Sequence, residues 1–495
     1  MRCAHRVRLR VVALLAVLSL AASNGVAFGQ TASDPVASAV KRQDWAAVRT
    51  RVERLDETDT VAAVNRPLGD GATALHWAAY WDHVETARLL IEVGARVNPE
   101  NDLGVTPLWL ASQNGSVTMV ETLLEAGADA NRGLPSGETP LMTSVRTGNV
   151  DVVAALVAHG AQVDAREASH GQTVLMWAVA QQHPAVVRVL LAGGARTDTR
   201  SNVYPQVVSS SGNADPSGVF EVTQGGYTPL LFAARQGDLA SARLLVAAGA
   251  AINDAAPSGT SPLVVAAHSG HGVLAAFFLE SGADPNDDAA GYAPLHAAVL
   301  RGDLELVTTL LAHGANPDVR LWKGTPARRV SADWRLAHNT IGATPFWLAA
   351  RFREPAIMRV LAESGADPLV PKNETTSLMA ALEGGTTRGR FGVPRLPPDQ
   401  EARLTVEAVR VALDGGVDVN DTNQNGNTAL HIATSRRLDA AIRLLAQRGA
   451  SLDLRNNQGE TPLDLAVSAP LAPSGHRPTA TLLRELGAED DGAPR

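Results

Sequence analysis

The sequence is poor in cysteine and in aromatic residues: it has one cysteine among 495 residues, and its aromatic content is 4%. The cysteine, Cys3, precedes an N-terminal apolar segment, so a chain cleaved after that segment forms no disulfide and has no thiol nucleophile. With few aromatic rings, alanine, leucine and valine must supply most of the core. That composition is typical of short, closely packed helices.

The sequence also lacks the motifs that carry common chemistries. It contains no phosphate-binding loop of the form G-x-x-x-x-G-K-[ST], no H-E-x-x-H metal motif and no G-x-S-x-G nucleophile elbow. We therefore predict no catalytic residues, no cofactor and no metal site. A third hypothesis is an enzyme whose active site is formed by insertions in the chain. A cluster of polar groups with shifted pKa values at the base of such insertions would favour it. The net charge of −8 argues against nucleic acid as a partner.

Long hydrophobic runs are absent apart from residues 11–22, VVALLAVLSLAA. Four arginines precede this run, and Ala27-Phe28-Gly29 follows it as a small-residue cleavage site. Residues 1–29 are thus expected to be a signal peptide, because the run is shorter than the ~20 residues of a spanning helix. We expect a periplasmic or secreted protein, with periplasm preferred and no membrane insertion after cleavage.

What the sequence does contain is a repeat of about 33 residues. Eleven segments share a start such as GVTPLWLASQ (104) or GETPLMTSVR (137), and each ends about twenty residues later in Gly-Ala or Gly-Val. Thr or Ser at the first position of the T-P-L-H motif can cap a helix, and Pro at the second suits its first turn. Glycine at the tenth position supplies a left-handed residue that ends this helix, and a second amphipathic helix follows.

These residues resemble the ankyrin repeat, with its 33-residue period and T-P-L-H-x-A signature. The resemblance implies an all-α solenoid of about 11–12 helix-turn-helix repeats joined by β-hairpin fingers. Residues 71–488 form the array, residues 30–70 an N-terminal capping repeat and residues 489–495 a polar tail. The resemblance also implies that the histidines of the motif bridge backbone groups of neighbouring fingers; these are His76, His296 and His431.

Three insertions interrupt the array, at about 203–225, 319–341 and 385–402. The first carries two short β-type runs around a turn-like segment and is expected to form a small hairpin. The second and third concentrate arginine on an otherwise acidic chain. Insertions in repeat proteins map to loops, often on the binding face.

The second insertion supplies the first set of candidate partner-binding residues, because tryptophan and arginine are enriched in interface hot spots. The set is Trp322, Lys323, Arg328, Arg329, Trp334 and Arg335. The alternative is that the two tryptophans only pack on neighbouring fingers and anchor the loop.

The resemblance implies a second candidate surface, at the end of each first helix on the concave side. The residues there are Tyr80, Trp81, Arg235, Arg351 and Phe352. For Tyr80 and Trp81 the alternative is contact with the N-terminal cap.

Together these features predict an exported, non-enzymatic scaffold, a monomer that binds a protein partner through its concave face and extended fingers. The alternative is a small or polymeric, glycan-like ligand held between the inserted fingers. Its stacking platforms would be Trp322, Trp334, Tyr204 and Phe220.

Overall fold

The computed structural model describes residues 35–209, 219–325, 336–385, 396–468 and 478–489. Residues 1–29, which were expected to be a signal peptide, and the tail beyond residue 489 lie outside these ranges. The chain divides into two compact units, residues 1–129 and 130–495, which are described one after the other.

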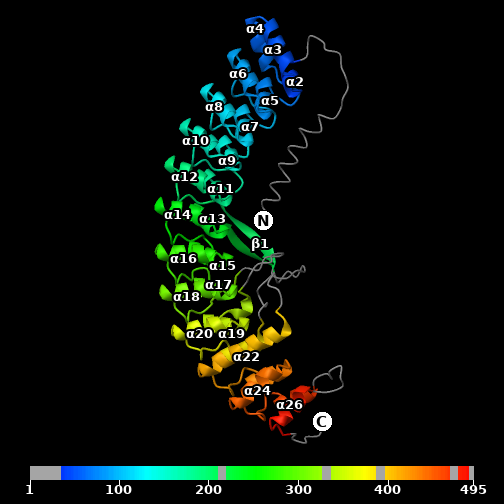
Figure 1. The fold of residues 1–495 in the computed structure, drawn as a ribbon, viewed down its shortest axis with the longest axis vertical. Helices are drawn as coiled ribbons and strands as arrows, with labels where there is room; N and C mark the ends of the chain where they lie inside the picture. Colours follow the sequence, from blue (N-terminus) through cyan, green and yellow to red (C-terminus); the bar gives the residue numbers. More distant parts are fainter. Residues whose placement is uncertain (1–34, 210–218, 326–335, 386–395, 469–477, 490–495) are drawn as a thin grey trace. The chain divides into compact units, whose positions relative to one another are not determined.

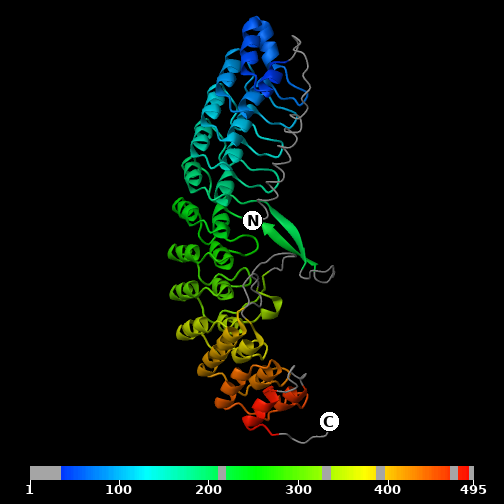
Figure 2. The ribbon, with the colours of Figure 1, turned by 45° about the vertical axis from the view of Figure 1, so that its right-hand side comes forward.

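The first unit is a stack of short helices. Residues 36–65, expected to cap the array, fold as three helices, and α2 packs on the first helix of the repeats, α5. Figure 2 shows the helices of this unit in two columns. Its helices are α2 (Val36–Lys41), α3 (Trp45–Arg54), α4 (Glu57–Asn65), α5 (Ala74–Tyr80), α6 (Val84–Glu92), α7 (Pro107–Asn114) and α8 (Val117–Glu125).

The second unit continues the pattern, with first helices packed on first helices and second helices on second helices (Figure 1). The first helices are α9 (Pro140–Val145), α11 (Val174–Ala180), α13 (Pro229–Gln236), α15 (Pro262–Ser269), α17 (Pro294–Arg301), α19 (Pro345–Phe352), α21 (Ser377–Glu383), α23 (Ala429–Ser435) and α25 (Pro462–Ser468). The second helices are α10 (Val150–Ala158), α12 (Pro184–Ala192), α14 (Leu239–Ala247), α16 (Gly272–Glu280), α18 (Leu304–Ala312), α20 (Pro355–Glu363), α22 (Pro398–Asp414), α24 (Asp439–Gln447) and α26 (Pro478–Glu485). The helical repeat predicted from the sequence is confirmed.

Hydroxyl side chains cap most of the first helices, as predicted, although α17 starts after Ala293. The side chain of Thr106 accepts a hydrogen bond from the backbone N–H of Trp109, and Thr344 does the same for Trp347. Pro107 and Pro345 occupy the first helical position, where the missing N–H costs no hydrogen bond.

The turn between the two helices is left-handed in nine of the ten repeats whose tenth motif position is described; the exception is Gly385, where the third insertion starts. Five of these residues are glycines, as predicted, but four have side chains, and φ lies between 53° and 81° in all nine. The four are Asp82, Gln182, Arg353 and Arg437. At Arg353 the turn is closed by the Glu354 N–H, which donates to the carbonyl of Ala349 at 2.9 Å. This closing bond offsets the roughly 1 kcal/mol that a non-glycine residue loses in the left-handed region.

The Gly-Ala or Gly-Val ending of each repeat is a second left-handed position. All eleven glycines there have φ between 82° and 105°. At nine of them an added Cβ would meet no atom within 4 Å, so the backbone conformation and not lack of space requires glycine.

The fingers are turns more than strands. Three contain an isolated β-bridge, and the only two strands in the described residues, β1 (Val203–Ser209) and β2 (Val219–Gly225), belong to the first insertion. They pair antiparallel from Val203 opposite Gly225 to Ser209 opposite Val219, which confirms the expected hairpin. The predicted β-hairpin fingers are mostly too short for a ladder of hydrogen bonds.

An asparagine or aspartate in most fingers ties its repeat to the next. The amide of Asn286 donates to the carbonyl of Gly314 at 2.9 Å, and its oxygen accepts from the N–H of Asn316 at 2.7 Å. Asn98 and Asn420 make the same two bonds to the repeats that follow them. We call this pair of bonds a rung.

The motif histidines bridge neighbouring repeats, as the resemblance implied. In His296, Nδ1 accepts from the N–H of Ala293 at 3.1 Å, so Nε2 carries the proton and donates to the carbonyl of Ala343 at 3.4 Å. His76 and His431 bond in the same way. Burial lowers the pKa of all three, and that of His296 falls to about 4.

This lowered pKa predicts that the protein loses stability in acid. Between pH 6.5 and about 4 the unfolded chain binds a proton that folded His296 does not, so the free energy of unfolding falls with pH by about 3 kcal/mol for this residue. Urea unfolding at pH 7.5 and 4.5 should show a smaller pH dependence in His296→Leu than in the wild type.

His159→Leu is the matched control, because His159 is exposed. It should keep the wild-type pH dependence. An unchanged dependence in His296→Leu would contradict this role for the buried imidazole.

Candidate functional site

The second insertion is anchored at both ends. Leu321 and Leu336 are buried, and the N–H of Thr325 donates to the carbonyl of Leu336 at 3.0 Å, so the two ends of the loop lie together. Trp322 is 53% exposed, yet its indole N–H donates to the carbonyl of Asp288 in the preceding finger at 3.1 Å. Trp322 therefore both packs on its neighbour and presents a face to solvent.

Most of the other candidates on this insertion lie outside the described residues. These are Arg328, Arg329, Trp334 and Arg335. Lys323 is described and exposed, beside Gly291 of the preceding finger. Of the aromatic platforms in the glycan hypothesis, the structure describes the side chains of Trp322 and Tyr204, and it places Tyr204 edge-on to His170.

Tyr80 and Trp81 lie together at the end of α5. Their rings meet edge to face with centroids 4.8 Å apart, and Tyr80 also contacts Trp77. Trp81 stays 39% exposed. The capping helices contact the neighbouring rings instead, with Lys41 over Trp77 at 4.6 Å and Trp45 stacked on His83.

The remaining candidates on the first-helix ends divide by burial. Arg235 is exposed at the end of α13. Phe352 is 2% exposed and packs inside the stack, so it is not a surface contact as the sequence suggested. Arg351 is 9% exposed, but its side chain lines a pocket.

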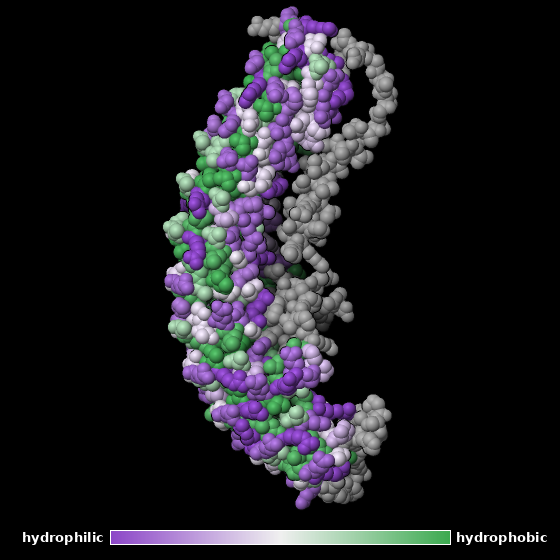
Figure 3. Space-filling view, viewed as in Figure 1, coloured by the Kyte–Doolittle hydropathy of each residue, from purple (hydrophilic) through white to green (hydrophobic). Residues whose placement is uncertain are grey.

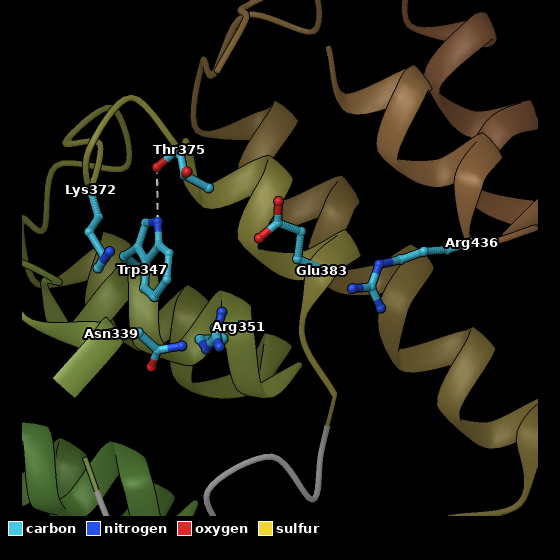
Figure 4. Close-up of a pocket in the computed structure, with 7 residues that line it drawn as sticks. All are labelled: Asn339, Trp347, Arg351, Lys372, Thr375, Glu383 and Arg436. Carbon is cyan, nitrogen blue, oxygen red and sulfur yellow. Dashed lines mark hydrogen bonds between the residues drawn. The ribbon is translucent and has the colours of Figure 1, made fainter. Parts of the chain in front are cut away.

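This pocket, which we call the basic pocket, has a volume of about 480 Å³ and collects residues from several segments of the second unit (Figure 4). Trp347 and Arg351 come from α19, Glu383 ends α21 and Arg436 follows α23. Its full lining is Asn339, Trp347, Arg351, Lys372, Thr375, Glu383 and Arg436. Sequence analysis named only Arg351, although cations at motif positions eight and nine of nearby repeats were a signal.

The finger that carries Lys372 is a tight two-residue hairpin. The N–H of Lys372 donates to the carbonyl of Thr375 at 3.0 Å, and the N–H of Thr375 donates back at 2.9 Å. The two residues between them, Asn373 and Glu374, have φ of 47° and 61°, as a type I′ turn requires. The turn fixes the position from which Lys372 reaches the pocket.

Trp347 forms the floor of the basic pocket. Its indole N–H donates to the carbonyl of Thr375 at 2.9 Å, the bond drawn in Figure 4. The ring has two cations near it, the Arg351 guanidinium at 5.5 Å and the Lys372 ammonium at 5.6 Å from the centroid. Cation–π attraction holds both side chains at the pocket.

The pocket is electropositive. Three cationic side chains and one carboxylate line it, a formal charge of +2 on a chain whose net charge is −8. Burial and the nearby charge of Arg351 lower the pKa of the Lys372 ammonium, and Glu383 opposes that shift. Low solvation and a second cation thus both disfavour charge on Lys372.

The second and third insertions both border this pocket. Asn339, in the short 3₁₀ turn His338–Thr340 at the end of the second insertion, lines it. The third insertion starts beside it, where the N–H of Gly385 donates to the carbonyl of Arg351 at 3.1 Å.

The third insertion rejoins the stack as extra turns of α22, whose 17 residues exceed the nine of most second helices. An ion pair fixes these turns: Nη1 of Arg353, 6% exposed, lies 2.6 Å from Oε1 of Glu401. Part of the expected insertion at 385–402 is therefore helix. Residues 386–395, which hold three of the arginines of this insertion, lie outside the described residues.

Within the described ranges, no cluster of three or more histidine, cysteine, aspartate or glutamate side chains could hold a metal ion. In the same ranges, no helix has the length and apolar content to cross a membrane. The hydrophobic surface is divided into small patches on the face drawn in Figure 3.

The fold defines a class, a stack of helical repeats with varied polar side chains on a regular frame. A family model for ankyrin repeats matches residues 45–134, 126–201, 230–320 and 402–491. The chain belongs to the ankyrin repeat family. Ankyrin repeats generally mediate protein–protein interaction.

Several known proteins are similar to parts of this chain. B-cell lymphoma 3 protein homolog of Mus musculus is 30% identical over 36% of this chain and 34% of its own length. Ankyrin repeat and SOCS box protein 18 of Homo sapiens is 30% identical over 37% and 45%. The solved ankyrin repeat domain of human ASB11 is 26% identical, with a TM-score of 0.40, over 54% of this chain and all of that domain. The chain therefore spans less than half the length of these two curated relatives.

Because Arg353 is buried, its ion pair with Glu401 is expected to contribute to the stability of the fold. Glu401→Gln should lower the free energy of unfolding by about 1–2 kcal/mol, because Arg353 stays buried without its carboxylate while Glu401 itself is only 36% exposed. Chemical unfolding followed by circular dichroism measures the change.

Asp399→Asn provides the comparison, since the Arg403–Asp399 pair on the same helix is 76% and 72% exposed. That change should cost less than about 0.5 kcal/mol. Equal effects of the two substitutions would show that α22 does not depend on the buried pair.

Proposed function

We propose that this chain is an exported scaffold that binds a protein partner through the finger side of its second unit. The partner-binding surface consists of the inserted fingers and the first-helix ends that border the basic pocket. The observation that carries the proposal is that two insertions, far apart in sequence, both border one electropositive pocket.

Three features support a binding role over catalysis. The motif histidines and the finger asparagines form hydrogen bonds between repeats, so these side chains have a structural role. Burial and the charge of Arg351 lower the pKa of Lys372, and its ammonium faces the Trp347 ring. Among the described residues it has no hydrogen-bonded acid or base as a catalytic partner. Exposed Arg436 in the pocket and exposed Trp322 on the second insertion suit an interface.

Export and a monomeric state are part of the proposal. Export is supported by the arginine-rich start, the short apolar run and the small residues up to Gly29.

The first experiment replaces residues 326–335 with two glycines. Thr325 and Leu336 are hydrogen-bonded to each other, so the shorter loop closes without moving Leu321 or Leu336. We expect the tagged wild-type chain to capture a specific protein from native envelopes by crosslinking, and the shortened chain to lose most of that capture at an unchanged melting temperature.

Equal capture by both chains would remove the second insertion from the interface. If the wild type captured no protein and bound cell-wall polymer instead, the glycan-like ligand would replace the protein partner. Trp322→Ala would then be expected to weaken polymer binding.

Export makes its own prediction. Expression in a Gram-negative host should give a periplasmic chain whose first residue is Gln30, as read by mass spectrometry of the intact protein. Removal of the apolar run 11–22 should keep the chain in the cytoplasm with its N-terminus uncleaved. A full-length chain in the cytoplasm of wild-type cells would refute export.

A further inference from the structure

We infer that the basic pocket is a binding site for a small dianionic ligand, such as inorganic phosphate or a dicarboxylate. The inference goes beyond the scaffold function and does not depend on it, because binding of a free ion is measured on the isolated chain.

The donors of the pocket outnumber its acceptors. Two guanidinium groups, an ammonium, the Asn339 amide and the Thr375 hydroxyl can donate, whereas Glu383 is the only carboxylate. Arginine binds carboxylate and phosphate oxygens through paired N–H groups, and such charge-assisted bonds are about twice as strong as neutral ones. Oxyanions match this set of side chains, and cationic ligands do not.

The charge of the pocket favours two negative charges over one. The three cations leave a formal +2 after Glu383 is counted. A dianion neutralises this excess and offsets the repulsion between Arg351 and Lys372, which adds to the effect of burial in lowering the pKa of the ammonium. A monoanion leaves part of that repulsion in place.

The size and lining of the pocket select small polar ligands. About 480 Å³ is near the lower end of ligand pockets, and the lining is almost wholly polar because Trp347 is 2% exposed and turns its ring toward the two cations. No apolar wall is available to bury a hydrophobic ligand. Asn339 and Arg436 are exposed, so an ion reaches the site from solvent without a change of fold.

The same dianionic chemistry has two sources, a free ion or two adjacent acidic side chains of a peptide. Isothermal titration of the full mature chain at low ionic strength compares inorganic phosphate, succinate, acetate and the capped dipeptide acetyl-Glu-Glu-amide. We expect phosphate or succinate to bind at least tenfold more tightly than acetate. A dipeptide that binds more tightly than both would assign the site to acidic side chains, and weaker binding would assign it to a free ion.

Four variants locate the binding. Lys372→Gln and Arg436→Gln should each weaken binding of the best dianion about tenfold or more, because each removes one charge-assisted contact. Glu383→Gln should tighten it severalfold. Arg188→Gln changes an exposed arginine on α12, outside the pocket, and should leave the affinity unchanged.

Circular dichroism of each variant establishes that the fold is intact; Lys372 and Arg436 are at least partly exposed, so neither change disturbs the core. The inference is overturned if no dianion binds below about 10 mM, or if the Lys372→Gln and Arg436→Gln chains bind as the wild type does. The inference is supported if a dianion binds the wild type and Arg188→Gln but not Lys372→Gln or Arg436→Gln. This result does not depend on whether the crosslinking experiment captures a protein partner.

Discussion

The rung between successive fingers is the contact on which the regularity of this molecule depends. One side chain satisfies two backbone groups of the next repeat at the end of its second helix, where helix geometry leaves carbonyls without partners. Apolar stacking is not directional, so it holds neighbouring repeats together but does not fix how they are aligned. The rung supplies that alignment, and each repeat then needs only its neighbours to be stable.

The rungs also explain how the stack tolerates insertions. A regular rung joins residues 31 apart, as between Asn98 and Asp129. The second insertion lies inside one such span, yet Oδ1 of Asp318 still accepts from the N–H of Asp367 at 2.9 Å across 49 residues. The extra residues leave and rejoin at one point, so the repeats on either side keep their contact. Longer closed loops add little entropic cost, which is why this arrangement is stable.

Much of this fold follows from local rules and could be predicted. Hydroxyl caps, first-turn prolines, left-handed glycines and bridging histidines each have a local cause, and the structure has them where the sequence indicated. The left-handed turn at Arg353 was not predictable, because a hydrogen bond from Glu354 and an ion pair with Glu401, 48 residues away, hold a residue that propensity disfavours. The burial of Phe352 was missed for a related reason: a motif position tells which side of the helix a residue is on but not how the next repeat covers it.

The basic pocket could not be predicted, because its residues come from different repeats and only the fold brings them together. Its charged side chains are not those that cap the first helices or form the rungs. Caps, turns and rungs use fixed motif positions, whereas Arg351 and Glu383 occupy the eighth position and Arg436 the ninth, where the residue type varies from repeat to repeat. Bringing Arg351 close to Lys372 creates a repulsion that stacking does not require. In a nearest-neighbour stack the stability of other repeats does not depend on that repulsion, so one pair of repeats can carry an electrostatically unfavourable site while the rest keep the chain folded.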